Sequence, residues 1–194
     1  MKPRKIGLFF GSFNPVHTGH MIIANYMATQ TDLDQVWMVV SPQNPLKKKK
    51  TLLNEYDRYR MAELALEGNG KIKPSDIEFR LPKPSYTIDT LSYLKEKNPS
   101  TDFVLIMGAD NIESFEKWKN YETILKYYQI YVYPRPGFDL GKYKHHSNVK
   151  LINAPLMEIS SSFIRDAIKQ GKDVRYFLPE KVYDYICKLN LYKV

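Results

Sequence analysis

The sequence has one cysteine among its 194 residues, Cys187, and no long uninterrupted apolar run. A single cysteine cannot form a disulfide within the chain, which is typical of proteins from a reducing compartment. The apolar stretch at residues 6–10 is too short for a signal peptide, and no run approaches the roughly 18 residues that span a membrane. We therefore expect a cytoplasmic protein with no membrane partner. Cys187 falls in an apolar pattern, so a buried, unreactive thiol is expected.

The sequence also has no internal repeat, no low-complexity tract, and neither of two common phosphate-binding fingerprints, GxGxxG and the GK[ST] of a P-loop. Its composition is ordinary, with 43% hydrophobic and 26% charged residues, which suits a globular protein with a real core. The length fits one domain. We expect residues 1–194 to form that domain, with a helical C-terminal part at about residues 160–194.

The chain carries 29 basic and 21 acidic residues, a formal net charge of +8, which suggests an anionic partner. Nucleic acid, a membrane surface and phosphorylated small molecules all fit such a charge. However, the basic residues are spread along the chain with one short lysine run at residues 47–50, and no RNP-like or KH-like motif is present. Nucleic acid is therefore not expected as a partner, whereas a homo-oligomer stays open.

Short apolar runs alternate with amphipathic stretches along the chain. The runs predict strands at residues 5–10, 35–40, 72–79, 103–107, 129–133 and 149–152. The amphipathic stretches predict helices at residues 20–31, 56–67, 87–97, 160–170 and 178–190. This alternation indicates an α/β fold with a doubly wound, mainly parallel sheet, whose ligands bind at the carboxyl ends of the strands. The loops expected at that edge are residues 11–18, 41–50, 108–111 and 134–138.

The first of these loops, GSFNPVHTGH at residues 11–20, joins a strand to a helix, where backbone N–H groups are available to an anion. Gly11 permits a sharp turn, and Pro15 stiffens the loop. His17 and His20 are three residues apart, so both imidazoles can lie on one face of the helix start. Donors placed there can hold phosphoryl oxygens and stabilise the charge that accumulates on them during transfer.

Two other interpretations of these histidines stay open. A histidine at a helix start is often a cap or a surface residue, and a histidine pair can bind zinc. A zinc site needs a third protein ligand, and the remaining histidines, His145 and His146, lie in a polar stretch. The sequence therefore predicts no metal site in the protein itself.

A second segment, ISSSFIR at residues 159–165, predicts a helix start. Ser160 is a favourable N-cap, and Ser161 and Ser162 follow in the first turn. Arg165 is four and three residues beyond them and can share their face. Hydroxyls, unpaired N–H groups and a guanidinium would then converge on a triphosphate or a departing pyrophosphate. Taken alone the segment is also compatible with a solvated arginine.

The two segments together resemble a known family. Gly11-x-Phe13-x-Pro15-x-His17-x-Gly19-His20 is similar to the GxFxPxHxGH signature of the nucleotidylyltransferase superfamily, and residues 159–165 resemble its ISSTxIR motif, with Ser162 where threonine is usual. The resemblance implies a Rossmann-like fold and catalytic roles for His17, His20 and Arg165. It implies an ATP site made of Gly11, Ser12, Phe13, His17, His20, Lys47, Gly108, Asp110, Ile159, Ser161, Ser162 and Arg165.

Within that superfamily, almost the whole chain resembles the bacterial nicotinate-nucleotide adenylyltransferases. The segments that carry this resemblance are SYTIDT at residues 85–90, GAD at 108–110, Trp118-Lys119 and RPGF at 135–138. The resemblance implies transfer of an adenylyl group from ATP to nicotinate mononucleotide in NAD biosynthesis, with Mg²⁺ carried in on ATP. Nicotinamide mononucleotide and phosphopantetheine stay open as alternative substrates. The implied nicotinate-nucleotide site contains Ser12, Asn14, Thr87, Trp118, Lys119 and Arg135.

The residue types suggest how the two nucleotides would be held. Trp118 is a flat partner for a pyridine ring, although it also fits a plain core position. Thr87 and the backbone N–H groups near Trp118 and Lys119 are candidate donors to the carboxylate. Asp110 can accept from ribose hydroxyls, cap a helix at residues 111–117, or do both. Lys47 is a candidate clamp on the triphosphate, although the family often has His-Lys where this chain has Leu46-Lys47.

Overall fold

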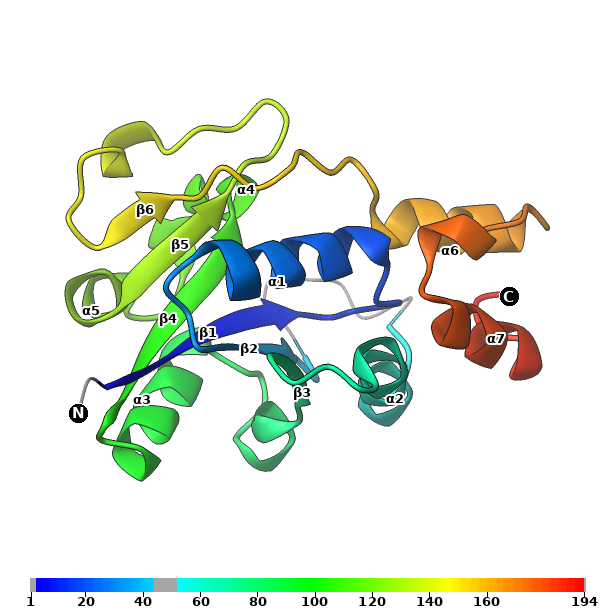
Figure 1. Cartoon of the computed structure of the whole chain (residues 1–194), viewed down its shortest axis with the longest axis horizontal. Coiled ribbons are helices and arrows are strands. Elements are labelled where there is room, and N and C mark those ends of the chain that lie inside the picture. Colours follow the sequence, from blue (N-terminus) through cyan, green and yellow to red (C-terminus); the bar gives the residue numbers. More distant parts are fainter. Residues whose placement is uncertain (1–2, 44–51, 194) are drawn as a thin grey trace.

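Six parallel strands form one sheet in the order β3-β2-β1-β4-β5-β6 (Figure 1). The computed structural model describes residues 3–43 and 52–193. The strands are β1 (Arg4–Gly11), β2 (Gln35–Val40), β3 (Ile72–Ser75), β4 (Thr101–Gly108), β5 (Gln129–Tyr133) and β6 (Val149–Leu151). β1 pairs with β2 on one side and with β4 on the other. The strand order therefore reverses between β1 and β4, which is where α/β sheets open a ligand crevice.

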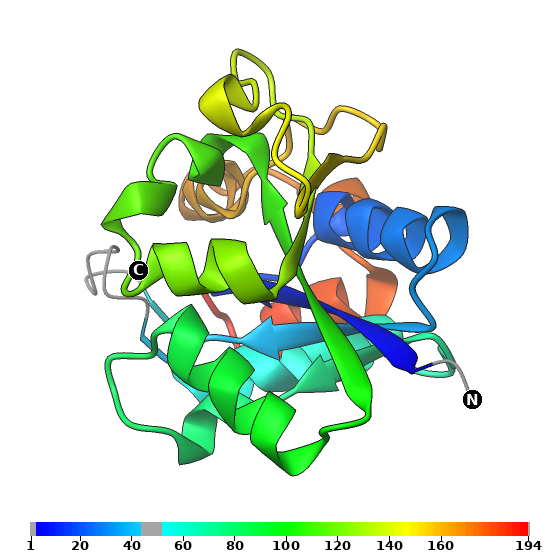
Figure 2. The ribbon, with the colours of Figure 1, turned by 90° about the vertical axis from the view of Figure 1, so that its left-hand side faces the viewer.

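Helices cover both faces of this sheet. They are α1 (Thr18–Gln30), α2 (Glu55–Leu66), α3 (Thr87–Lys97), α4 (Ala109–Ile112), α5 (Tyr121–Tyr127), α6 (Ser161–Lys169) and α7 (Glu180–Lys188). Figure 2 shows α1 on one side of β4 and α3 with α5 on the other. A doubly wound α/β fold with a parallel sheet, as predicted, is confirmed.

The strands divide their side chains between two cores because neighbouring residues point to opposite faces. In β4, Val104 and Ile106 pack with α1, α2, α6 and α7, whereas Phe103, Leu105 and Met107 pack with α3, α4 and α5. Burial on both faces explains why the strands read as continuous apolar runs instead of alternating ones.

One predicted strand ends early. The run at residues 72–79 forms a strand only over Ile72–Ser75, and a 3₁₀ turn follows at Ile77–Arg80. The Ser75 hydroxyl accepts the N–H of Ile77, which starts the turn locally. Phe79 then leaves the sheet and makes edge-to-face ring contacts with Tyr56 and Tyr59 of α2. Tertiary packing on α2 thus replaces the strand pairing that the apolar pattern suggested.

Two further expectations need correction. Cys187 is exposed, not buried, because α7 turns Val182 and Ile186 toward the core and Cys187 falls about 100° further round the helix. The helix expected at residues 111–117 is two shorter pieces, α4 and a 3₁₀ turn at Phe115–Lys117. Asp110 does not cap α4, since Gly108 holds the N-cap position and Asp110 lies in the first turn.

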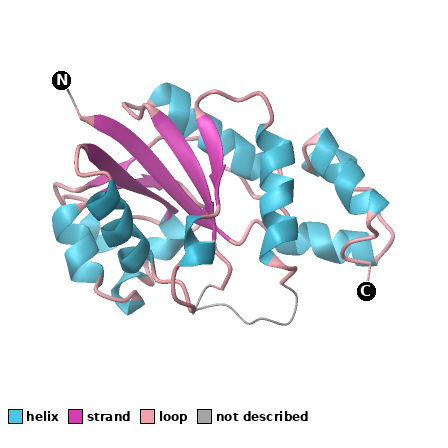
Figure 3. Cartoon of the chain, turned by 90° about the horizontal axis from the view of Figure 1, so that it is seen from below, coloured by secondary structure: helices cyan, strands magenta, loops and turns pink. Residues whose placement is uncertain are grey.

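The strands run toward the end of the molecule that carries the C-terminal helices. In Figure 3 the N-terminus lies at one end of the sheet, and the C-terminal helices lie beyond the other. Among residues 3–43 and 52–193, no helix has both the length and the apolar character needed to cross a membrane.

Candidate active site

A cavity of about 650 Å³ opens at the carboxyl edge of the sheet. Its wall combines the segments that follow β1, β2 and β4 with the starts of α3 and α6, as the positions of the loops predicted. Every site residue expected from the sequence lines this cavity, apart from two. Ile159 packs half-buried against the core that includes α1 and α6. Lys47 lies outside the described residues.

The loop after β1 owes its shape to a buried phenylalanine. Phe13 has a positive φ of 45° and is almost fully buried, with its ring edge-to-face against Phe9 and His20. A Cβ atom on Gly11 would lie 2.7 Å from the Phe13 ring. Gly11 is therefore needed because Phe13 folds back over it. The peptide bond before Pro15 is cis.

His17 and His20 hold each other at the start of α1. The backbone N–H of His17 donates to Nδ1 of His20 at 3.2 Å, and the backbone N–H of His20 donates to Nδ1 of His17 at 3.4 Å. The two rings stack with their centroids 3.6 Å apart. Since each Nδ1 is an acceptor, the hydrogen of the neutral ring is on Nε2. His17 is thus the N-cap of α1, and this role uses its Nδ1, whereas its Nε2 carries the hydrogen.

Burial determines the charge of His17. The side chain is 4% exposed, and burial, with a smaller contribution from the nearby Arg135 cation, lowers its pKa to about 4. His17 is therefore neutral near pH 7 and acts as a hydrogen-bond donor, not as a cation.

The start of α6 is tied directly to the loop after β1. Ser160 caps α6 by accepting the N–H of Phe163, as predicted. The Ser161 hydroxyl donates to the carbonyl of Pro15 at 3.0 Å. Arg165 donates to the carbonyl of Asn14 at 2.8 Å and to the Ser162 hydroxyl at 3.2 Å. Arg165 is thus a fixed side chain of the cavity and not a solvated one.

The cavity wall also contains the residues expected to meet the pyridine ring. Trp118 is half-buried, packs edge-to-face on Phe115, and also faces the cavity, so it serves both the core and the site. Its Nε1–H is buried without a hydrogen-bond partner among the described residues. Thr87 is the first residue of α3. Lys119 pairs with Asp89 at 2.9 Å and lies over the Tyr86 ring, so its ammonium is already engaged.

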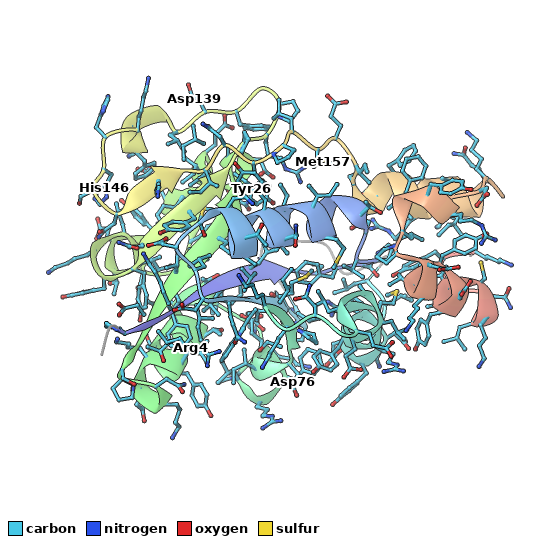
Figure 4. The ribbon with its side chains drawn as sticks, viewed as in Figure 1. Arg4, Tyr26, Asp76, Asp139, His146 and Met157 are labelled. Carbon is cyan, nitrogen blue, oxygen red and sulfur yellow. The ribbon has the colours of Figure 1, made fainter. Side chains whose placement is uncertain are left out.

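A third group of side chains closes the cavity beside β4 and β5. Nε of Arg135 lies 3.6 Å from Oδ1 of Asp110. The Arg135 guanidinium also donates to the carbonyl of Met157, which lies on the segment that leads to α6 (Figure 4). Gly108 leaves room for the Asp110 carboxylate, since a Cβ atom there would lie 2.3 Å from Oδ1 in its present position. This arrangement fixes a carboxylate and a guanidinium side by side in the cavity wall.

Sequence reasoning missed a buried carboxyl group in the cavity wall. Glu78 is 1% exposed, and the Thr90 hydroxyl donates to its Oε1 at 2.8 Å. Burial raises the pKa of Glu78, and the hydroxyls of Ser41, Thr90 and Ser85 moderate that rise. The sequence offered one weak signal of this carboxyl group, because Glu78 follows a strand. We missed it because the strand predicted at residues 72–79 included Glu78 itself.

Within the described parts of the chain, no group of three or more His, Cys, Asp or Glu side chains gathers in a way that could hold a metal ion. The cavity wall instead offers hydrogen-bond donors and positive charge to a ligand. Two neutral imidazoles, a helix start and two guanidinium groups face one space, which suits a polyphosphate.

Comparison with known proteins gives a consistent result. The model of the cytidylyltransferase-like family matches residues 8–167. A probable nicotinate-nucleotide adenylyltransferase of Flavobacterium psychrophilum is 56% identical over 191 residues, covering 97% of this chain and 99% of the relative. A protein of the same description from Bacteroides thetaiotaomicron is 49% identical over 182 residues, covering 94% and 90%.

Solved structures share the fold at lower identity. The nicotinic acid mononucleotide adenylyltransferase of Plasmodium falciparum, in complex with NaAD, superposes with a TM-score of 0.84 at 24% identity, covering 97% of each chain. A putative nicotinate-nucleotide adenylyltransferase from Vibrio parahaemolyticus gives a TM-score of 0.74 at 21% identity, covering 98% of this chain and 96% of that one. At these identities the two structures support the fold.

Proposed function

Because the chain belongs to the nicotinate-nucleotide adenylyltransferases of the cytidylyltransferase-like family, we infer that it transfers the adenylyl group of ATP to nicotinate mononucleotide. The products are nicotinate adenine dinucleotide and pyrophosphate, so the enzyme is a nucleotidyltransferase of NAD biosynthesis. One observation carries the assignment to this cavity. His17, His20 and Arg165 line the same cavity as Thr87 and Trp118, so one cavity offers both donors for phosphate and a flat partner for a pyridine.

The nucleophile needs little activation. The 5′-phosphate of nicotinate mononucleotide is ionised near neutral pH, and its oxygen attacks the α-phosphorus of ATP in line with the departing pyrophosphate. The P–O bond to the nucleophile forms as the bond to the β-phosphate oxygen breaks. No covalent enzyme intermediate is required. Positioning and charge stabilisation then carry the rate.

The two imidazoles stabilise the reacting phosphates. The Nε2–H groups of His17 and His20 donate to oxygens of the α- and β-phosphates, where negative charge increases in the transition state. Their Nδ1 atoms already accept backbone N–H groups, so the rings are oriented before substrate binds. A preoriented neutral donor costs no reorganisation when the charge develops.

The start of α6 receives the pyrophosphate. Arg165 is fixed by Asn14 and Ser162, and the Ser161 and Ser162 positions bring backbone N–H groups of the first turn toward the cavity. A helix start and a guanidinium both favour an anion. Mg²⁺ bound with ATP would supply positive charge that offsets the charge of the triphosphate.

The nicotinate half lies across the cavity. The pyridine ring stacks on Trp118, and its carboxylate accepts from Thr87 and from backbone N–H groups near Trp118 and Lys119. Asp110 accepts from ribose hydroxyls. The side chain of Lys119 is not the carboxylate partner in this scheme, because Asp89 already holds it. We place the enzyme in the cytoplasm as one domain.

The test is pyrophosphate release from ATP with each co-substrate in turn. Nicotinate mononucleotide should react faster than nicotinamide mononucleotide, and phosphopantetheine should not react. Equal rates with the acid and the amide would overturn the substrate assignment while leaving the transfer chemistry in place. No release with any of the three would overturn the assigned activity.

A further inference from the structure

A buried arginine lies directly behind the phosphate-binding loop at residues 11–14. Arg58, in the first turn of α2, is 0% exposed. Its guanidinium donates to four backbone carbonyl groups: those of Ser12 at 2.6 Å, Ser41 at 2.8 Å, Leu53 at 3.0 Å and Pro42 at 3.1 Å. One side chain thus joins the segment after β1, the segment after β2 and the start of α2.

This arginine is held by carbonyl groups and not by a carboxylate. Among the described residues no ion pair includes Arg58, and the nearby Glu55 is bonded to Lys83 at 2.6 Å. Burying a guanidinium costs free energy unless its N–H groups have acceptors. The hydrogen bonds to the four carbonyl groups therefore allow Arg58 to be buried. Since an arginine stays protonated, a positive charge remains fixed behind the loop.

The C-terminal segment reaches the same loop from another direction. The buried hydroxyl of Tyr192 donates to Oδ1 of Asn14 at 2.9 Å. That oxygen also accepts the N–H of Leu53 at 3.3 Å, while the Leu53 carbonyl accepts from Arg58. Asn14 itself is 4% exposed, and its carbonyl accepts from Arg165. Figure 1 shows the end of β1, α2 and the C-terminus at the same end of the molecule.

We propose that Arg58 and Tyr192 are positioning residues of the phosphate-binding loop, acting through Ser12 and Asn14. These two residues flank Phe13, and their backbone sets the path into His17 and His20. Arg58 fixes the carbonyl of Ser12, and Tyr192 fixes the side chain of Asn14. The proposal rests on the proposed function, because the loop must hold reacting phosphates for its exact path to affect the rate. A displacement of about 1 Å at a reacting centre can cost about 10² in rate.

The chain offers a matched control for Tyr192. Tyr185 also lies in the C-terminal part, and its hydroxyl donates to the Asp57 carboxylate of α2 at 2.9 Å. Tyr192→Phe and Tyr185→Phe each remove one buried or half-buried tyrosine hydroxyl bond to another part of the fold. Only the first bond ends on the phosphate-binding loop. If the hydroxyl bonds serve stability alone, both variants should lower Tm with unchanged kinetics.

The experiment measures kcat and KM for ATP and nicotinate mononucleotide, together with Tm with and without ATP. Tyr192→Phe should lower kcat/KM by about five- to tenfold, the value expected for one lost hydrogen bond expressed in the transition state. Tyr185→Phe should stay within about twofold of the wild type. Equal kinetics in both variants would overturn the role of Tyr192. The rise in Tm that ATP alone produces tests the loop without turnover. A wild-type protein that binds ATP but is inactive would therefore contradict the proposed function and leave the proposal about Arg58 and Tyr192 standing.

Arg58 is tested by Arg58→Lys, which keeps the charge but cannot serve four carbonyl groups from three segments. Its kcat should fall by about tenfold or more. Arg60→Lys is the control, because Arg60 lies two residues further along the same helix, is exposed, and pairs with Glu63 at 3.2 Å. A folded Arg58→Lys protein with wild-type kcat and KM would overturn the role of Arg58. If Arg58→Lys does not fold, the comparison of Tyr192→Phe with Tyr185→Phe still tests whether side chains outside the cavity position the phosphate-binding loop.

Discussion

The imidazole rings of His17 and His20 stack 3.6 Å apart between centroids, and each Nδ1 accepts the backbone N–H of the other residue. A helix cap and a phosphate donor were among the uses that the sequence left open for these histidines. The cap is now established, and it uses the Nδ1 atoms. Because Nδ1 accepts, Nε2 carries the hydrogen, and capping prepares the ring for donation in the other direction. The two uses are therefore compatible in one residue.

The first prediction concerns His20. His20→Ala removes an Nε2–H that we assign to the charge developing on phosphate, so kcat should fall by about 10² or more. Steady-state pyrophosphate release at saturating ATP and nicotinate mononucleotide measures it. His20→Asn is the control for the cap, since its side-chain oxygen can still accept the N–H of His17. An unchanged kcat in the alanine variant would refute the catalytic role.

The second prediction concerns the pH dependence of stability. The pKa of His17 is lowered from 6.5 in the unfolded chain to about 4 in the folded protein, chiefly by burial. Between these values the unfolded chain binds more protons, so acid favours unfolding. Stability should therefore be complete above pH 6.5 and fall toward pH 4, by up to roughly 3 kcal/mol from this residue.

His17→Asn isolates that contribution. Asparagine is a good N-cap but does not titrate. The free energies of unfolding of the wild type and the variant, measured in urea from pH 4 to pH 7.5, should diverge as the pH falls below 6.5. Parallel curves over the whole range would contradict a buried, neutral His17.

The third prediction concerns Glu78. Burial raises the pKa of its carboxyl above the value in the unfolded chain, so the folded protein binds the extra proton. Stability from this group is therefore full below pH 4.5 and is lost as the pH rises through the folded pKa. Glu78→Gln keeps an acceptor for Thr90 and cannot ionise. Its Tm relative to the wild type should be higher at pH 7.5 than at pH 4.

Glu63→Gln provides the control for that experiment, because Glu63 is partly exposed and pairs with Arg60 on the surface of α2. Its Tm difference from the wild type should change little between the two pH values, since surface ion pairs contribute little to stability. A Glu78→Gln protein whose Tm follows the same course as Glu63→Gln would show that burial does not raise the pKa of Glu78.

The fourth prediction concerns Trp118. Trp118→Ala removes the flat surface proposed for the pyridine ring, so KM for nicotinate mononucleotide should rise by about five- to tenfold, with KM for ATP nearly unchanged. Fluorescence gives an independent readout. The chain has two tryptophans, and Trp37 packs on Phe103 away from the cavity. In Trp37→Phe the remaining signal is Trp118, and nicotinate mononucleotide should quench it. Unaltered fluorescence at saturating nucleotide would count against stacking.

Much of the architecture follows from local features of the sequence. Apolar runs of strand length, such as residues 103–107, need burial on both faces, and this requirement leads to a parallel sheet covered by helices. Ser160 caps α6 because its side chain lies next to the N–H groups it satisfies. Features of this kind depend on neighbouring residues in the chain, so they can be predicted from the sequence before the tertiary structure is known.

Other features depend on partners that only the folded chain brings together. Arg58 lies on an amphipathic helix, where an arginine is normally solvated, yet it is buried because carbonyl groups 46 and 17 residues away, at Ser12 and Ser41, accept its hydrogens. The prediction of one strand over residues 72–79 was wrong because Phe79 packs on α2. The prediction of a buried thiol at Cys187 was wrong because α7 turns other residues toward the core.

The sequence by itself determined the class of fold, the strand-to-helix loop that holds the histidines and the family to which the chain belongs. The tertiary structure decided which nitrogen of each histidine accepts a backbone N–H, how Arg165 is held, and which side chains support the phosphate-binding loop. The physical reason is the range of the interactions. Hydrophobic periodicity and helix capping act between near neighbours, whereas a buried polar group is satisfied only by partners that folding brings from distant parts of the chain.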